Sequence, residues 1–220
     1  MTTREIMDQR AMMYAERLHR RHHAIQNAGL AVGKFSEAPY CRGDFTTLAS
    51  FTAEASLLGK TPPEQPQIPS SFLTDVGKAI LFQAMGVVST TGTPTYIFQC
   101  RLSSTVGTST LSGTSIGVTP TITAASGVTN SFWWLDLLIW VKAPGQGTTN
   151  TTLNCQGLLR SPDGFGVNSY ALSPTTPPTA TFTATIDNSV TQYFNLSVTC
   201  GTSNASNAVT CKTLVMHGLN

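Results

Sequence analysis

The stretch Ser131-Phe-Trp-Trp-Leu-Asp-Leu-Leu-Ile-Trp-Val-Lys142 predicts a β-strand that is apolar on both faces. Successive side chains of a strand point to opposite sides. One side would carry Trp133, Leu135, Leu137, Ile139 and Val141, and the other side Phe132, Trp134, Asp136, Leu138 and Trp140. A strand in a sandwich needs only one apolar face, so the second face of this strand requires a cover.

The second face predicts an oligomer interface made of Phe132, Trp134, Leu138 and Trp140. Two tryptophans and a phenylalanine on one exposed face form a patch large enough to drive association. A neighbouring subunit is the favoured cover, because one long loop hides a single tryptophan more easily than two. Cover from within the chain, by a loop or by the N-terminal segment, is the alternative.

On either side of this strand the chain alternates short β-type runs with turn residues. We expect strands at 78–89, 95–103, 116–124, 131–142, 150–160, 179–187, 191–200 and 208–217, with a weaker one at 45–57. The prolines at positions 62, 63, 66 and 69 predict an extended surface segment. Many short strands predict a mainly β fold, an antiparallel sandwich of jelly-roll type.

A helical arm is predicted ahead of this β-rich body. Residues 3–28 contain neither Pro nor Gly, Thr3 can cap the helix, and Gly29 can end it. The apolar seam of this helix contains Met7, Ala11, Tyr14, Leu18, Ile25 and Ala28, and Arg21 interrupts it. Either a short coiled coil or a helix docked in a partner's groove fits this pattern. The predicted domains are therefore a basic arm with its connector, 1–42, and a body, 43–220.

The charges are distributed unevenly between these two parts. Residues 1–42 hold seven of the thirteen Lys and Arg residues and four of the eleven Asp and Glu residues. Charged residues make up 11% of the chain, against about 25% in typical soluble domains. This composition predicts a module that is held by its arm and packs against neighbours through its body.

The arm is expected to contact a protein rather than nucleic acid. Its docking residues would be Arg10, Arg17, Arg20 and Arg21. Acidic residues at positions 5, 8 and 16 are interleaved with these arginines, and arms that bind nucleic acid are usually less acidic. An acidic protein surface is therefore the preferred partner.

No motif in the chain predicts catalysis. Gly113-Thr-Ser-Ile-Gly117 matches the Gly-x-Ser-x-Gly pattern, but its Thr/Ser-rich surroundings lack the strand, turn and helix that a nucleophile elbow needs. His19 and His23 lie one helical turn apart, but Arg20 and Arg21 between them disfavour a divalent metal. We expect a protein that is not an enzyme and has neither cofactor nor metal.

The cysteines and the apolar runs indicate in which compartment the protein is found. Cys41, Cys100, Cys155, Cys200 and Cys211 have no metal-ligand spacing and are expected to be small buried hydrophobic residues. Cys200 and Cys211 flank a polar loop and are the one pair that a hairpin disulfide could join. No apolar run reaches about 18 residues and no signal peptide is recognisable, which predicts a cytosolic protein with no membrane contact.

Six segments of the body share a diffuse pattern: 52–58, 68–78, 80–88, 96–102, 134–137 and 203–215. In this pattern the body resembles β-rich structural proteins of tailed bacteriophage virions. The resemblance implies a jelly-roll-like virion protein, often a trimer, that decorates or cements the capsid. Its partners would be further copies of itself and the major capsid protein or another virion protein, after assembly in the host cytoplasm. The alternative is a receptor- or glycan-binding module of a tail fibre or spike, with Phe165 and Tyr170 as candidates for stacking on sugars.

Overall fold

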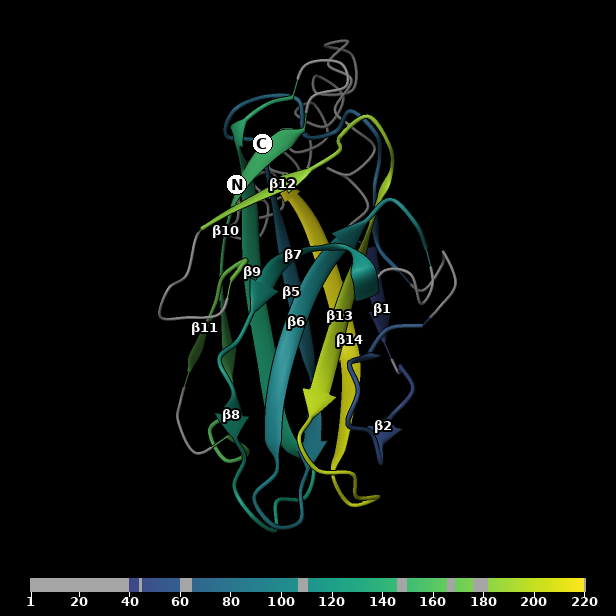
Figure 1. The fold of residues 1–220 in the computed structure, drawn as a ribbon, viewed down its shortest axis with the longest axis vertical. Coiled ribbons are helices and arrows are strands. Elements are labelled where there is room, and N and C mark those ends of the chain that lie inside the picture. Colours follow the sequence, from purple (N-terminus) through teal and green to yellow (C-terminus); the bar gives the residue numbers. More distant parts are fainter. Residues whose placement is uncertain are drawn as a thin grey trace, which may run out of the picture. The chain divides into compact units, whose positions relative to one another are not determined.

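The computed structural model describes residues 40–43, 45–59, 65–106, 111–145, 150–165, 169–175 and 182–219. The predicted arm helix and its four docking arginines lie outside these residues. Within them the chain forms two antiparallel β-sheets, which confirms the prediction of a mainly β fold. Figure 1 shows the two sheets one behind the other.

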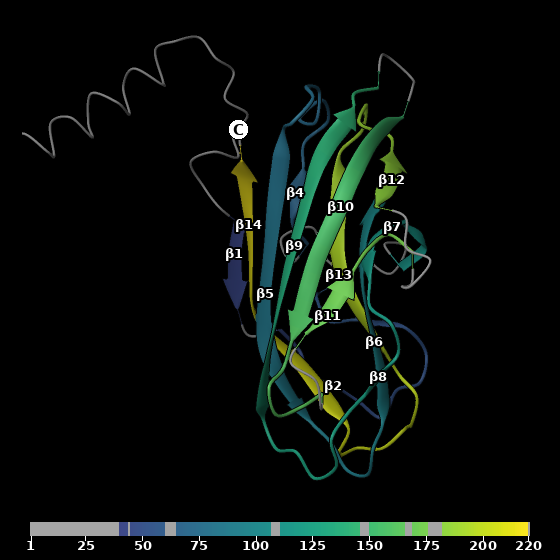
Figure 2. The ribbon, with the colours of Figure 1, turned by 90° about the vertical axis from the view of Figure 1, so that its left-hand side faces the viewer.

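The larger sheet has eight strands. Its main path runs in the order β1 (Tyr40–Gly43), β14 (Ala208–Leu219), β5 (Ala79–Ser89), β9 (Ser131–Ala143), β10 (Thr151–Arg160) and β11 (Tyr170–Leu172). β2 (Leu48–Ala49) also pairs with β14, and β12 (Thr183–Ile186) also pairs with β10. In Figure 2 the strands β14, β5, β9 and β10 of this sheet lie side by side.

The smaller sheet has six strands. Its main path runs in the order β3 (Ala55–Ser56), β13 (Gln192–Cys200), β6 (Thr95–Ser103) and β7 (Thr114–Val118). β4 (Gln67–Ile68) pairs with β13, and β8 (Ile122–Thr123) pairs with β6. The pairing of the long strands is nested: β5 pairs with β14, and β6 pairs with β13.

The core lies between the two sheets and is rich in aromatic rings. Phe82 of the larger sheet stacks on Phe194 of the smaller sheet with ring centroids 4.0 Å apart. Phe98 of the smaller sheet lies 5.3 Å from Trp133 of the larger one. All four side chains are fully buried. Face-to-face packing of the sheets therefore buries one side of each long strand.

The observed strands agree with the predicted ones where the alternation is long. Residues 95–103 form β6 as predicted, and the strand predicted at 131–142 extends to residue 143. The strand predicted at 116–124 is instead two strands, β7 and β8, separated at Pro120, which has no N–H to donate to a sheet ladder. Of the strand predicted at 179–187, residues 179–181 lie outside the described part and 183–186 form β12.

The weaker strand predicted at 45–57 is wrong in its extent. This segment contains only β2 and β3, because it pairs first with β14 in the larger sheet and then with β13 in the smaller one. β1, β4 and β11 were not predicted. β1 begins at Tyr40, inside the expected connector, and lies along β14 at the edge of the larger sheet.

Candidate interaction surface

The outer face of the larger sheet is apolar along β9. Trp133 and the residues that alternate with it are fully buried against the smaller sheet, as predicted. The other side chains of the strand point outward: Phe132 is 72% exposed, and Trp134, Leu138 and Trp140 are half-buried. The four residues predicted to form an interface therefore share one face of the sheet, and a second chain in contact with them stays a prediction.

β5 extends this apolar surface sideways. Its outward residues are the cross-strand neighbours of those on β9: Ala79 of Trp140, Leu81 of Leu138, Met85 of Trp134, and Val87 of Phe132. Met85 is 52% exposed. We call these eight side chains, together with Gln83 and Asp136, the outer face. The contribution of β5 was not predicted from the sequence, although residues 79–88 are also apolar at alternate positions on both sides.

The centre of the outer face is polar. Gln83 and Asp136 are cross-strand neighbours, and the Gln83 Nε2 donates a hydrogen bond to Asp136 Oδ1 over 2.8 Å. Beside this pair lies an open hollow of about 220 Å³, lined by Leu81, Asp136, Leu138, Gln156, Gly157 and Leu158. A hydrogen-bonded pair inside an apolar surface can confer specificity on a contact, because each polar group must find a partner when water is excluded.

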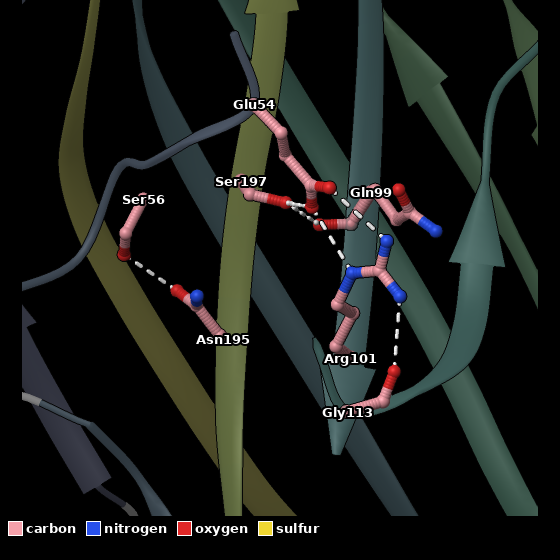
Figure 3. A network of polar contacts seen from close by, with 7 residues as sticks. All are labelled: Glu54, Ser56, Gln99, Arg101, Gly113, Asn195 and Ser197. Atoms are coloured by element: carbon pink, nitrogen blue, oxygen red, sulfur yellow. Dashed lines mark hydrogen bonds and ion pairs between the residues drawn. The ribbon is translucent and has the colours of Figure 1, made fainter. Parts of the chain in front are cut away.

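The outer side of the smaller sheet differs along β13, because the chain itself covers part of that strand. Asn195 and Ser197 of β13 point away from the core and yet are fully buried. Glu54, from the segment before β3, reaches across β13 to Arg101 of β6 (Figure 3). The cover is thus provided by the segment that was predicted to be a weak strand.

The contacts under this cover are charge-assisted hydrogen bonds. The Arg101 Nε and Nη2 donate to the two carboxylate oxygens of Glu54 over 3.0 and 3.1 Å, and Nη1 donates to the Gly113 carbonyl over 2.9 Å. Ser197 Oγ donates to Glu54, and Ser56 Oγ donates to Asn195 Oδ1 over 2.6 Å. This network fastens the covering segment to the sheet, and no pattern in the sequence predicted it.

The Gly-x-Ser-x-Gly pattern does not form a nucleophile elbow. Ser115 lies within β7, where it pairs with Arg101 of β6. His217 lies on β14 and Asp136 on β9, both in the other sheet. Within the described residues, no group of three His, Cys, Asp or Glu side chains could hold a metal ion.

The two aromatic residues considered for glycan stacking do not form a sugar platform. Phe165 is fully buried and contacts the rings of Tyr96 and Phe98. Tyr170 is half-buried, and its hydroxyl donates a hydrogen bond to the Phe165 carbonyl over 2.7 Å. The interpretation of Phe165 as a stacking residue is therefore wrong, because its ring belongs to the core.

Four cysteines are buried free thiols, in line with the expectation of small hydrophobic residues. Cys200 lies on β13 and Cys211 on β14, in different sheets, so they do not face each other across a hairpin. Burial raises the pKa of both Cys155 and Cys211 to about 12. The described part of the chain contains no helix long and apolar enough to span a membrane.

Fold and surface together define a mainly β protein of two antiparallel sheets, one partly covered along β13 by its own chain and the other carrying an apolar outer face. Comparison with known protein families, with curated proteins and with solved structures finds no match to this chain.

Proposed function

We propose that the protein is a non-enzymatic structural protein of a virion, a capsid decoration or cement protein that assembles through the outer face. The outer face is the observation that carries this proposal. Phe132 and Met85 are more than half exposed on neighbouring strands, beside two half-buried tryptophans. An apolar surface of this kind marks a site of protein contact. A surface with few charges, as in this chain, also favours contact with copies or partners.

The virion role is inferred from the resemblance described above and from the strand pairing. In a jelly roll, the outermost strands of the chain pair with each other and the next strands inward do the same. The nested pairs β5 with β14 and β6 with β13 support a jelly-roll-type arrangement. The basic arm attaches the body to an acidic surface of the major capsid protein or another virion protein, and the body packs against further copies.

Assembly through the outer face is tested by replacing Trp134 and Trp140 together with Ser. The double variant should lose the oligomer and keep the fold, since the core side of β9 carries Trp133 and its buried neighbours. Light scattering measures the mass, and circular dichroism checks the fold. Phe182→Ser is the matched control, because Phe182 is 56% exposed but lies outside the outer face. An oligomer that survives the double substitution contradicts this part of the proposal.

Attachment is tested by co-sedimentation with empty capsids. Reversing Arg17, Arg20 and Arg21 to Glu should abolish binding of the full chain. Salt at about 1 M should weaken wild-type binding, because the Debye length then falls to about 3 Å. Unchanged binding by the reversed variant, or binding that requires accessible nucleic acid, contradicts the docking role of the arm.

The second candidate function is a receptor- or glycan-binding module, and one observation favours it. A hollow of about 410 Å³ is lined by polar side chains, among them Ser103, Thr114, Asn150 and Asp187. Hydroxyl and amide groups of this kind can bind a saccharide, although none of the described residues that line the hollow is aromatic. Specific binding on a glycan array, lost in Asp187→Ala and combined with no affinity for capsids, would favour this function over the first.

A further inference from the structure

We propose that two copies of the chain pack their larger sheets face to face about a twofold axis that runs parallel to the strands, between β5 and β9. The axis places β5 of one copy on β9 of its partner. This inference rests on the proposed assembly through the outer face and specifies how that face pairs. The order of strands in Figure 2 places β5 and β9 side by side near the middle of the sheet.

The sizes of the side chains favour this axis over the other one available. The outward residues of β9 are bulky, namely Phe132, Trp134, Leu138 and Trp140. Their neighbours on β5 are aliphatic and mostly smaller, namely Val87, Met85, Leu81 and Ala79. A twofold axis between these strands puts each bulky residue opposite the aliphatic member of the same row. An axis perpendicular to the strands would put tryptophan-bearing β9 on another β9 and leave a gap above β5, which costs dispersion contacts.

The polar centre favours the same axis. Gln83 and Asp136 occupy one row, so the rotation places Asp136 opposite the partner's Gln83, and Gln83 opposite the partner's Asp136. The amide of Gln83 has a second N–H and the carboxylate of Asp136 has a second oxygen, so hydrogen bonds can form across the axis as well as within each sheet. The perpendicular axis through this row would instead bring the two carboxylates together, and like charges repel.

The outer face together with the flanking strands β14 and β10 is large enough for a stable contact. Four strands about 4.8 Å apart and about nine residues long, at about 3.3 Å per residue, cover roughly 600 Å² in projection. Because side chains project from the sheet, the solvent-accessible area of this surface is larger than its projected area. It therefore approaches the roughly 800 Å² that each partner buries in a standard interface. Leu158 of β10, 37% exposed, and Leu219 of β14, 41% exposed, extend the apolar area at its sides.

The test uses two opposite charges in the full-length chain. Leu81→Arg and Leu138→Glu should each turn the dimer into a monomer, measured by sedimentation equilibrium, with at least a 100-fold rise in the dissociation constant. An equimolar mixture of the two variants should dimerise again to within about tenfold of wild type at low salt, because the new arginine lies opposite the new glutamate of the partner. Val76→Glu is the control and should leave the dimer unchanged, since Val76 is 69% exposed outside the outer face.

A second pair, Val87→Arg with Phe132→Glu, repeats the test at cross-strand neighbours near the far end of the face, where Phe132 is 72% exposed and tolerates charge. Recovery in both mixtures supports the proposal.

Single variants that dissociate but do not recover when mixed overturn this pairing and leave assembly through the outer face intact. A wild-type trimer, as the phage resemblance implies, also overturns the twofold axis alone. A monomeric wild type overturns both, and means that the chain covers the face itself.

Discussion

Trp133 fits between the sheets because its neighbour on β5 is a glycine. Gly86 lies directly across from Trp133 in the ladder. A Cβ at position 86 would come within 2.5 and 2.7 Å of two atoms of the indole ring, and it would also overlap the carbonyl oxygen of Thr210. The indole N–H donates to the Val87 carbonyl over 3.2 Å, which fixes the ring in place. The missing side chain thus makes room for the largest residue of the core.

Gly86→Ala should therefore destabilise the protein by about 3 kcal/mol, since neither the backbone carbonyl nor the hydrogen-bonded indole can move away cheaply. Urea unfolding followed by tryptophan fluorescence measures the change. Gly117→Ala is the matched control: the nearest atoms to its Cβ would be the side-chain ends of Leu137 and Leu172, at 3.3 Å. We expect a loss of about 1 kcal/mol or less there, and equal losses at both positions would disprove the explanation.

The buried thiols make the fold sensitive to alkali. Burial raises the pKa of Cys155 and Cys211 from an ordinary value of 9.0 to about 12, although a backbone hydrogen bond to each opposes the rise. Between pH 9 and 12 the unfolded chain loses thiol protons that the folded chain keeps. The stability that these thiols contribute is complete below pH 9 and falls as pH rises, by up to about 1.4 kcal/mol per pH unit for each thiol.

Cys155→Ala should reduce this slope between pH 9 and 10, even though the smaller side chain lowers stability at pH 7. Urea unfolding at closely spaced pH values measures the slope. Leu159→Ala, at another fully buried position of β10, is the control: it creates a cavity without removing a thiol and should keep the wild-type slope. Identical slopes for wild type and Cys155→Ala would rule out a protonated buried thiol as the cause.

Among the elements, the segment that carries β2 and β3 explains why the two sheets have different outer sides. It crosses from the edge of β14 to the edge of β13. Glu54 anchors it to Arg101 with side chains only 24% and 18% exposed. Two well-aligned hydrogen bonds in such a partly buried pair are stronger than a surface ion pair.

A double-mutant cycle with Glu54→Gln and Arg101→Met should show a coupling of about 1–3 kcal/mol in the free energy of unfolding. The double variant should lose less stability than the sum of the two single losses. Each single variant leaves a charged or polar partner without its match, whereas the double variant removes both partners. The same cycle on Lys78 and Asp75 is the control, since that ion pair lies at the surface with Asp75 72% exposed. Coupling indistinguishable from this control would mean that the network does not hold the segment.

At the level of the complete chain, the body should fold and assemble without the arm. A truncation to residues 39–220 keeps β1 on β14 and retains the whole core. It should have the same oligomeric mass as the full chain in light scattering. A truncation to residues 43–220 removes most of β1 and leaves β14 without this edge partner, so it should be less stable or aggregate. A monomeric 39–220 fragment would place the oligomer contacts in residues 1–38.

Much of the fold could be predicted because a strand's alternation is a local property. The faces of β9 follow from the order of its residues, and so do the buried side of Trp133 and the apolar outer positions at 132, 134, 138 and 140. The same reasoning applied to residues 79–88 would have identified the outward residues of β5. The uneven distribution of charge and the apolar seam of the predicted arm helix likewise follow directly from the order of residues.

Only the tertiary structure decided which strands are neighbours and which outer side is covered. Glu54 and Arg101 are 47 positions apart, and no local pattern indicates that a carboxylate before β3 will cross β13 to reach β6. Gln83 and Asp136 become neighbours only because β5 pairs with β9 in one register out of many. Phe165 lies in a loop, yet its ring is buried against the rings of Tyr96 and Phe98 of β6. These outcomes depend on the total burial and hydrogen bonding of the entire sandwich, a sum over distant segments that a local pattern does not contain.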